Sequence, residues 1–459
     1  MMKRIHLIGI GGSGMSSIAR VLLEQGLTVS GSDRTLSPLA LNLRAAGAIV
    51  YEGHDPQHIE GVDMVVRSSA IADDNPEVAA ALALGIPVLK RQDFMRDLTR
   101  ERLCIAIAGS HGKTTTSTMM AWSLVQLGLD PGYILGGVSR NLANNAHAGS
   151  GELFVVEADE YDYMFLGLNP AVILLTNVEY DHPDCFPTAE KYQAAFSQFV
   201  HQLEPGGLLV TNADDPGAAA KRHDIPESAR VVTYGLNEPA DYSAIDWRVN
   251  AAGGYDFKIS ALQIHAPVAQ VSLAVPGMHN VRNALGVLSA LHALGFPVQQ
   301  AADALSFYSG SSRRFEVIGE VAGITIIDDY AHHPSKISAT LSAARVRYPR
   351  RRLVVVWQPH TYSRTQALES DFIRAFDDAD LLVVTAIYAA REQARAYSAE
   401  QMVEKMKAPS VSYIPQIPDV VDFLLKTLQK GDVLIVLSAG DADQVCREVR
   451  TRLQERKGE

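Results

Sequence analysis

Cysteine is scarce in this sequence. Its 459 residues include three cysteines, Cys104, Cys185 and Cys446, which are scattered along the chain. So few, widely separated thiols exclude a disulfide framework, and their spacing matches no cysteine metal site. This usage is typical of a protein from a reducing compartment, so we expect a cytoplasmic location.

The sequence also lacks long apolar runs and an excess of basic residues. No stretch of about 18 apolar residues occurs, so we expect no membrane span. Lysine and arginine total 41 against 52 aspartates and glutamates, which gives a net charge of −11. A general nucleic-acid binder needs basic surface to displace counterions, so we expect no nucleic-acid partner.

What the sequence does contain is an alternation of short apolar strands and helices. Apolar residues make up 47% of the chain, and roughly 150 residues per domain suggests about three domains. We predict a three-domain α/β fold: a Rossmann-like N-terminal domain (1–100), a central P-loop ATPase domain with a mostly parallel sheet (101–312) and a C-terminal Rossmann-like domain (313–459). Short alternating runs at 205–275 predict an antiparallel addition to the central sheet.

A phosphate-binding loop follows the predicted strand at 103–108. Its glycines let backbone N–H groups turn towards phosphate oxygens, while the following helix N-terminus and a lysine add positive charge. The loop is a shortened variant, because Ile107 stands where the motif usually has its first glycine. A tight turn with an incidental lysine is the alternative. We predict ATP contacts at Gly109, Ser110, His111, Gly112, Lys113, Thr114 and Thr115, with the Thr114 hydroxyl placed to meet Mg²⁺.

A second glycine-rich loop lies at 9–14, and Asp33 follows about 20 residues later. Alone this pattern indicates a nicotinamide cofactor, but the loop reports only a diphosphate on a helix N-terminus, which a UDP-sugar satisfies equally well. A purely structural glycine turn is the alternative, as helix capping is for the serines at 68–69. The predicted UDP-sugar contacts are Gly11, Gly12, Ser13, Gly14, Met15, Ser32, Asp33, Ser68 and Ser69.

Carboxylates and imidazoles follow neighbouring predicted strands. Glu157 ends the strand at 153–156, and His182 lies beyond the strand at 172–175. A carboxylate and an imidazole at one sheet edge beside a phosphate loop can bind a divalent cation, with solvated acidic loops as the alternative. We therefore predict a metal site formed by Thr114, Glu157 and His182.

Polar residues at 279–283 start a well-patterned helix, where asparagines either cap the helix or present amides to an adenine edge. Two histidine-rich loops, at 328–334 and 358–364, follow buried strands and predict a substrate pocket. A zinc site formed by His332, His333 and His360 is conceivable there, but no dedicated spacing supports it.

Seven motifs in fixed order resemble the Mur ligases of peptidoglycan synthesis over essentially the whole chain. They are GSHGKTTT (109–116), Glu157, TNVEYDH (176–182), PGMHNVRNAL (276–285), SSRRFE (311–316), DDYAHHP (328–334) and QPHTYSRT (358–365). Within the family, GIGGSGMS (9–16) and QPHTYSRT are similar to the branch that joins L-alanine to UDP-N-acetylmuramate. The resemblance implies an ATP- and Mg²⁺-dependent ligase that acts through an acyl phosphate, as a monomer or weak homodimer.

The resemblance also implies roles for individual residues. Glu157 and His182 match the metal-linked positions, Arg314 matches an arginine that reaches the ATP phosphates, and Asp329 matches the aspartate that holds the ribose. The adenine motif is matched by His279, Asn280 and Asn283. His360 and Arg364 lie in the motif that receives the amino acid and the acyl end of the nucleotide. The implied catalytic set is Lys113, Glu157, His182, Arg314, His360 and Arg364, with the general base left open between the two histidines.

Three positions bear on the branch of the family. Thr361 stands where alanine ligases often carry arginine, and Phe196 stands where other branches carry a carbamylated lysine. Tyr161, in the run EADEYD (157–162), resembles the murein tripeptide recycling ligase at this position, and that ligase is the main alternative. A nicotinamide-dependent oxidoreductase leaves the loop at 109–116 unexplained, and a non-catalytic nucleotide-binding regulator would bind ATP without turnover.

Overall fold

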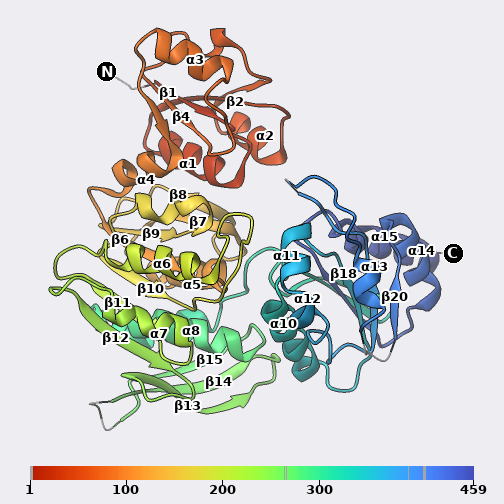
Figure 1. Cartoon of the computed structure of the whole chain (residues 1–459). Coiled ribbons are helices and arrows are strands. Elements are labelled where there is room, and N and C mark those ends of the chain that lie inside the picture. Colours follow the sequence, from red (N-terminus) through yellow and green to blue (C-terminus); the bar gives the residue numbers. More distant parts are fainter. Residues whose placement is uncertain (1–3, 263, 265, 391, 407–409, 459) are drawn as a thin grey trace.

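The computed structural model describes residues 4–262, 264, 266–390, 392–406 and 410–458. Three sheets follow one another along the chain, and helices cover each of them (Figure 1). This arrangement confirms the predicted three-domain α/β class, while the domain limits at 100 and 312 stay predictions. No helix in the described residues is long and apolar enough to cross a bilayer.

The N-terminal sheet is entirely parallel, in the order β3-β2-β1-β4-β5. Its strand order reverses between β1 and β4, and ligands of open parallel sheets bind outside the carboxyl ends at such a switch point. The glycine loop follows β1 and Ser68 follows β4, so both predicted contacts flank that point. The elements are β1 (Arg4–Ile8), α1 (Ser13–Glu24), β2 (Thr28–Asp33), α2 (Pro38–Ala45), β3 (Ile49–Glu52), η1 (Pro56–Ile59), β4 (Met64–Arg67), α3 (Pro76–Ala83), β5 (Val88–Lys90) and α4 (Arg91–Thr99).

The central sheet has ten strands in the order β15-β14-β13-β12-β11-β10-β6-β9-β7-β8. Its strands are β6 (Leu103–Ala108), β7 (Gly132–Ser139), β8 (Asn144–His147), β9 (Leu153–Glu157), β10 (Val172–Leu175), β11 (Leu208–Asn212), β12 (Arg230–Gly235), β13 (Tyr242–Val249), β14 (Tyr255–Ala261) and β15 (Ala269–Leu273). The helical segments are α5 (Lys113–Gln126), η2 (Tyr161–Gly167), α6 (Ala189–Val200), α7 (Pro216–Ala220), η3 (Lys221–His223), α8 (Met278–Ala293) and α9 (Val298–Leu305). Because β9 and β10 flank β6, their loops meet the phosphate loop at one sheet edge.

The antiparallel part of this sheet is smaller than the sequence suggested. We expected residues 205–275 to form an antiparallel addition, but β11 and β12 pair in parallel. Among the described residues of that region, antiparallel pairing is confined to β13, β14 and β15. A second antiparallel pair, β7 with β8, lies at the opposite edge of the sheet.

The C-terminal sheet has the order β16-β17-β21-β18-β19-β20, with antiparallel β16 at one edge. Its strands are β16 (Glu316–Val321), β17 (Ile324–Asp329), β18 (Leu353–Trp357), β19 (Leu381–Val384), β20 (Val411–Tyr413) and β21 (Val433–Leu437). The helices are α10 (Pro334–Arg347), α11 (Tyr362–Ala367), α12 (Glu369–Phe372), α13 (Ala399–Val403), α14 (Ile417–Thr427) and α15 (Gln444–Gly458). Helices α10, α11 and α12 face the central unit (Figure 1).

The hydrophobic cores do not follow the three sheets one to one. One cluster runs from Ile5 and Leu7 of β1 to Phe196 and Phe199 of α6, so it joins the N-terminal and central units. The two faces of the C-terminal sheet have clusters of their own, which contain only residues of that unit. The C-terminal unit is therefore the one that can move without opening a shared core.

Candidate active site

The predicted phosphate loop joins β6 to α5. Gly109 has a φ of 137° and Gly112 a φ of 80°, both in the region that favours glycine. A Cβ on Gly109 would overlap Thr176 Oγ1 and lie 2.9 Å from the Asn177 carbonyl oxygen. Glycine is therefore required here for a close backbone approach as well as for the turn.

Lys113 is the first residue of α5, and its ammonium group lies inside this loop. It donates to the Gly109 carbonyl at 2.7 Å and to the carboxylate of the fully buried Glu160. Burial lowers the pKa of Lys113, but Glu160 outweighs that effect, and the net pKa is raised. The lysine is thus held charged at the N-terminus of α5, as phosphate binding requires.

Glu157 lies beside the loop and is held by three donors. Its carboxylate accepts from Thr114 Oγ1 at 2.9 Å, Ser117 Oγ at 3.2 Å and the Gly136 N–H at 2.7 Å. Burial raises the pKa of Glu157, although Lys113 opposes it. A hydroxyl and a carboxylate that face each other provide the oxygen donors that Mg²⁺ prefers.

His182, the third predicted metal ligand, lies on the far side of Glu160. Its Nε2 is 3.6 Å from Glu160 Oε1 and 3.9 Å from Asp181 Oδ2. Glu160 therefore stands between Lys113 and His182, a placement that we did not predict. The acidic run at 157–160 was the sequence feature that could have indicated it.

The C-terminal unit contributes cations to the same place. Arg314 lies over the ring of Tyr330, and its Nη2 is 3.4 Å from Thr114 Oγ1. Asp329 accepts from the Phe315 and Ala331 N–H groups at 2.7 and 2.8 Å, so its carboxylate also fixes the turn that carries Arg314. Burial raises the pKa of Asp329.

Arg364, on α11, joins the central and C-terminal units. Its Nε donates to Asp181 Oδ1 at 2.7 Å, and its terminal nitrogens lie 3.1 Å from His360 Nδ1 and 3.3 Å from His182 Nδ1. Arg364 and Asp181 are both buried. Burial alone would raise the pKa of Asp181, but His182 and Arg364 hold that pKa well below its usual range. Thr361 lies in the same wall, with a φ of 64°.

The predicted adenine motif begins α8. Asn280 donates to the Pro276 carbonyl at 2.7 Å, and Asn283 donates to Asn280 at 3.3 Å, so both amides are oriented. Asn283 also packs against Gly112, where a Cβ would lie 2.9 Å from its Oδ1. Burial lowers the pKa of His279 to about 4, which keeps its ring neutral.

One open cleft of about 1190 Å³ collects most of these groups. Every predicted catalytic residue lines it, and so do the predicted metal residues. The predicted ATP contacts that line it are Ser110, His111, Gly112, Lys113, Thr114, Thr115, His279, Asn280, Asn283 and Asp329. Gly109 is not among the residues that line the cleft, because it packs against Thr176 and Asn177. Lys336 of α10 also lines the cleft, and its sequence context gave no indication of this.

Of the predicted UDP-sugar contacts, Ser13 alone is among the residues that line this cleft. A hydrogen bond from the Gly11 N–H to Asp33 Oδ2, 2.9 Å long, fixes the glycine loop to the end of β2. Met15 is buried, and the buried Ser32 hydroxyl donates to Glu77 Oε2 at 2.5 Å. These side chains shape the loop from inside, whereas Gly12 and Ser69 are exposed and Gly14 and Ser68 are partly exposed.

Arg91 is the functional candidate that sequence reasoning missed in this unit. Its guanidinium packs against Gly14, where a Cβ would lie 2.7 Å from Arg91 Cζ. Burial lowers the pKa of Arg91, while Asp159 and Asp162 of the central unit oppose that effect. A cation at the glycine loop is what a diphosphate site needs.

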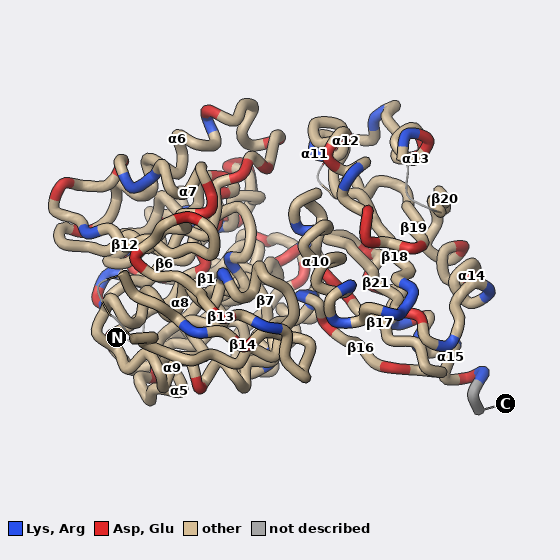
Figure 2. Tube along the Cα trace, turned by 90° about the horizontal axis from the view of Figure 1, so that it is seen from below, with Lys and Arg blue, Asp and Glu red and all other residues tan. Residues whose placement is uncertain are grey.

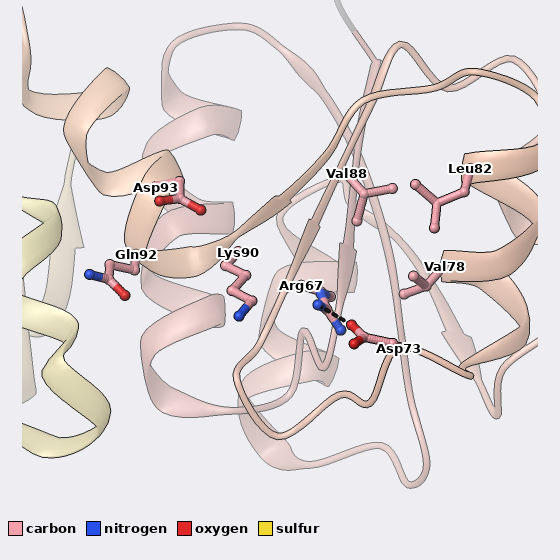
Figure 3. Close-up of a pocket in the computed structure, with 8 residues that line it drawn as sticks. All are labelled: Arg67, Asp73, Val78, Leu82, Val88, Lys90, Gln92 and Asp93. Carbon is pink, nitrogen blue, oxygen red and sulfur yellow. Dashed lines mark hydrogen bonds and ion pairs between the residues drawn. The ribbon is translucent and has the colours of Figure 1, made fainter.

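A smaller cavity of about 440 Å³ lies between β5 and α3 and is lined by Arg67, the last residue of β4 (Figure 3). Arg67 and Lys90 lie on its floor, and Arg67 Nη2 pairs with Asp73 Oδ1 at 2.5 Å. Val78, Leu82 and Val88 form its apolar wall. The cavity extends the predicted sugar-nucleotide edge of the N-terminal sheet.

The conceivable zinc set of His332, His333 and His360 does not assemble. The His332 and His360 rings lie 5.7 Å apart, and His332 Nδ1 lies 2.8 Å from the Tyr330 carbonyl oxygen. His333 points instead to His111, with ring centroids 4.6 Å apart. Adjacent residues on an extended turn face opposite ways, which explains the separation.

Family models cover nearly the whole chain. They are described as the Mur ligase family catalytic domain (residues 4–102), the Mur ligase middle domain (107–291) and the Mur ligase glutamate ligase domain (313–440). Proteins named UDP-N-acetylmuramate--L-alanine ligase are similar throughout. That of Chloroflexus aggregans is 44% identical, with 99% of each chain covered, and that of a Roseiflexus species is 42% identical, with 96% and 97% covered.

Two solved structures share the fold. UDP-N-acetylmuramate-alanine ligase MurC from Thermotoga maritima has a TM-score of 0.82 at 28% identity, with 99% of each chain covered. A murein peptide ligase from Psychrobacter arcticus has a TM-score of 0.71 at 26% identity, with 98% of each chain covered.

Proposed function

Since the chain belongs to the Mur ligase family, we propose that it joins L-alanine to the carboxylate of UDP-N-acetylmuramate in peptidoglycan synthesis, with ATP converted to ADP and phosphate. The observation that carries the proposal is full-length similarity to ligases of that name. The phosphate loop, the carboxylates and the C-terminal arginines that share one cleft support it.

A carboxylate is a poor electrophile, because attack breaks its resonance and adds charge to an anion. Transfer of the γ-phosphoryl group to the carboxylate gives an acyl phosphate with a better leaving group. The neutral amine of alanine then attacks, and phosphate leaves from the tetrahedral intermediate. Lys113 and Arg314 would offset the charge on the phosphoryl group during transfer.

The donor set beside the phosphate loop fits Mg²⁺. Thr114 Oγ1 and the Glu157 carboxylate are 2.9 Å apart, and we propose that they hold the ion, with His182 as its more distant neighbour. The ion would supply further positive charge for the phosphates. Glu160 would keep Lys113 and His182 in place.

We assign the remaining roles as proposals of the same kind. The backbone of Gly11, Gly12, Ser13 and Gly14, together with Ser68 and Ser69, would hold the UDP diphosphate, while Met15, Ser32 and Asp33 shape that loop. His279, Asn280, Asn283 and Asp329 would hold the adenosine, with the N–H groups of Gly109, Ser110, His111, Gly112 and Thr115 around the phosphates. His360, Arg364 and Thr361 would receive the amino acid and the acyl end.

The murein peptide recycling ligase is the second candidate, favoured by Tyr161. An acceptor assay separates the two functions: the full chain is incubated with ATP, Mg²⁺, UDP-N-acetylmuramate and single amino acids or a murein tripeptide. Phosphate release that is strongest with L-alanine supports the proposal, and release that requires the tripeptide overturns it. The same preparation, examined by sedimentation, tests the prediction of a monomer or weak homodimer.

The variant Lys113→Ala tests the separation of the two nucleotide sites. We expect ligation to fall by at least roughly a hundredfold, because one charge that stabilises the transferring phosphoryl group is removed. UDP-N-acetylmuramate binding, measured by calorimetry, should stay within about twofold, because that site lies in another unit. Lys258→Ala is the control, since Lys258 pairs with Asp246 at an exposed edge of β14. Loss of both properties would show that the sites are not separate.

A further inference from the structure

Three potential metal ligands meet where the central and C-terminal units touch, beside the Mg²⁺ donors but distinct from them. They are His111 of the phosphate loop, Glu179 of the loop after β10 and His333, the residue before α10. Within the described residues, one ligand atom from each lies within 4.8 Å of the other two. His111 Nε2 is 2.8 Å from Glu179 Oε2, and His333 Nδ1 is 4.0 Å from Glu179 Oε1.

Three of the four imidazole nitrogens of this cluster lack a partner among the described residues, while His111 Nε2 is bonded to Glu179. His111 Nδ1 and both ring nitrogens of His333 are buried without a hydrogen-bond partner in the described residues. The side chain of His333 is 3% exposed. A buried donor or acceptor without a partner is destabilising, so such nitrogens point to a ligand.

The protonation state of the cluster suits a metal ion. Burial lowers the pKa of His333 to about 3 and also lowers that of His111, so both rings are neutral at physiological pH. Burial alone would raise the pKa of Glu179, but His111, Ser335 and His333 together outweigh it and lower the pKa to about 2. Neutral imidazoles and an ionised carboxylate are the forms that bind metals.

We propose that His111, Glu179 and His333 form a transition-metal site that binds Zn²⁺ and bridges the central and C-terminal units. Two imidazoles and one carboxylate with an open fourth position form a zinc ligand set, whereas Mg²⁺ selects oxygen ligands. The Ser335 hydroxyl donates to Glu179 Oε1 at 2.5 Å and orients the carboxylate.

The site borders two cavities, because His111 and Glu179 line the ATP cleft and Glu179 and His333 line a second one. Glu179 is 43% exposed at its side chain and, with His333, lines a separate cavity of about 490 Å³ that Ser338, Asp371 and Arg374 also border. Because the ligands belong to two units, a bound ion would hold those units in the closed arrangement. Enzymes that close around their substrates must open to exchange them. A bound ion would therefore slow opening and substrate exchange.

Cobalt absorption and calorimetry test the site directly. The full chain, stripped with chelator, is titrated with Co²⁺ and then with Zn²⁺ in excess Mg²⁺. We expect a visible Co²⁺ band that Zn²⁺ abolishes, and a Zn²⁺ dissociation constant of about 1 μM or tighter. His333→Gln and Glu179→Gln should each weaken Zn²⁺ binding at least roughly tenfold. His201→Gln, an exposed histidine beside Asp224, should leave it unchanged.

Hydrogen exchange checks the bridging part of the proposal. In the natural chain, Zn²⁺ should slow the amide hydrogen exchange of both segments, 177–182 and 332–340. In His333→Gln it should slow the exchange of neither segment. Absence of Zn²⁺ binding overturns the proposal. Binding that both variants retain also overturns it, because the ion would then lie elsewhere, for example at His6, His54 and His58 around the buried Glu77. Unchanged exchange of the free variants would show that they fold normally.

Discussion

At the scale of single residues, Lys336 lines the cleft together with Lys113, Arg314, Arg364 and further arginines. Burial, together with Arg314, Lys113 and Arg364, lowers the pKa of Lys336 to about 8, although Asp181 opposes this. Lys113 has Glu160 and Arg364 has Asp181 as partners, whereas no ion pair of Lys336 occurs among the described residues. A cation in the cleft that has no carboxylate partner among the described residues can pair with a phosphate group of ATP.

The pH dependence of ATP use should report this lysine. Lys336 is charged below its pKa and loses its charge as the pH rises through about 8, so kcat/KM for ATP should fall between pH 7 and 9. Lys336→Met should be roughly tenfold slower at pH 7 and should lack this alkaline decline. Lys336→Arg should keep its kcat/KM at pH 9. The same decline in Lys336→Met would assign the titration to another group.

Gly136 offers a second test at this scale. A Cβ there would overlap the Glu157 carboxylate, whose position the Gly136 N–H helps to fix. In Gly136→Ala we therefore expect the Mg²⁺ concentration for half-maximal ligation to rise about tenfold, as when an orienting partner of a metal ligand is lost. In Gly137→Ala, a Cβ meets only the Thr114 methyl at 3.2 Å, so the Mg²⁺ concentration for half-maximal ligation should change little. An equal rise in both variants would contradict the placement of the ion at Glu157.

At the scale of elements, the parallel strands were the part that the sequence could predict. The predicted bounds of the strands at 103–108 and 172–175 match β6 and β10, because buried parallel strands are short apolar runs between polar loops. The phosphate loop was predictable because its motif is contained in the consecutive residues 109–116. The β7–β8 hairpin is a local pair that the sequence analysis did not predict, whereas the positions of Glu160, Arg91 and Lys336 depend on partners far along the chain.

The buried polar cluster beneath α3 gives a prediction for the N-terminal unit. Glu77 is fully buried, with His54 Nδ1 at 3.1 Å and His58 Nδ1 at 2.7 Å from its carboxylate. Burial alone would raise the pKa of Glu77, but His6, Ser32 and His58 outweigh it and lower the pKa to about 2. The folded state therefore favours the ionised form, and this contribution of about 3 kcal/mol is present above pH 4.5 and lost as the pH falls towards 2.

In Glu77→Gln, the thermal midpoint of the N-terminal unit should fall at pH 6, and the difference from the natural chain should shrink as the pH approaches 3. Glu52→Gln, a change at an exposed residue of β3, serves as the control. A difference that stays constant over this pH range would show that the loss comes from packing and not from the carboxylate charge.

At the scale of the whole molecule, the units are joined in two different ways. The N-terminal and central units share an apolar cluster, whereas the C-terminal clusters contain residues of that unit only. Seen from below, the C-terminal unit stands beside the rest of the molecule with α10 at the boundary (Figure 2). Polar contacts such as Arg364–Asp181 and Ser335–Glu179 cross that boundary. A polar boundary is suited to reversible closure around three substrates.

Asp181→Asn tests whether the buried ion pair keeps the molecule closed. The change removes the charge that compensates Arg364, and a buried cation without its partner costs about 3–5 kcal/mol. The C-terminal unit can avoid this cost by swinging out, which returns Arg364 to water. We therefore expect a larger radius of gyration in X-ray scattering without ligands, and a return towards the natural value with ATP and UDP-N-acetylmuramate, whose anionic groups replace the lost charge. Asp422→Asn breaks the exposed pair with Arg452 inside the C-terminal unit and should leave the radius unchanged. An Asp181→Asn protein that stays compact would mean that the remaining polar contacts hold the closed form, and that the pair serves only to position Arg364.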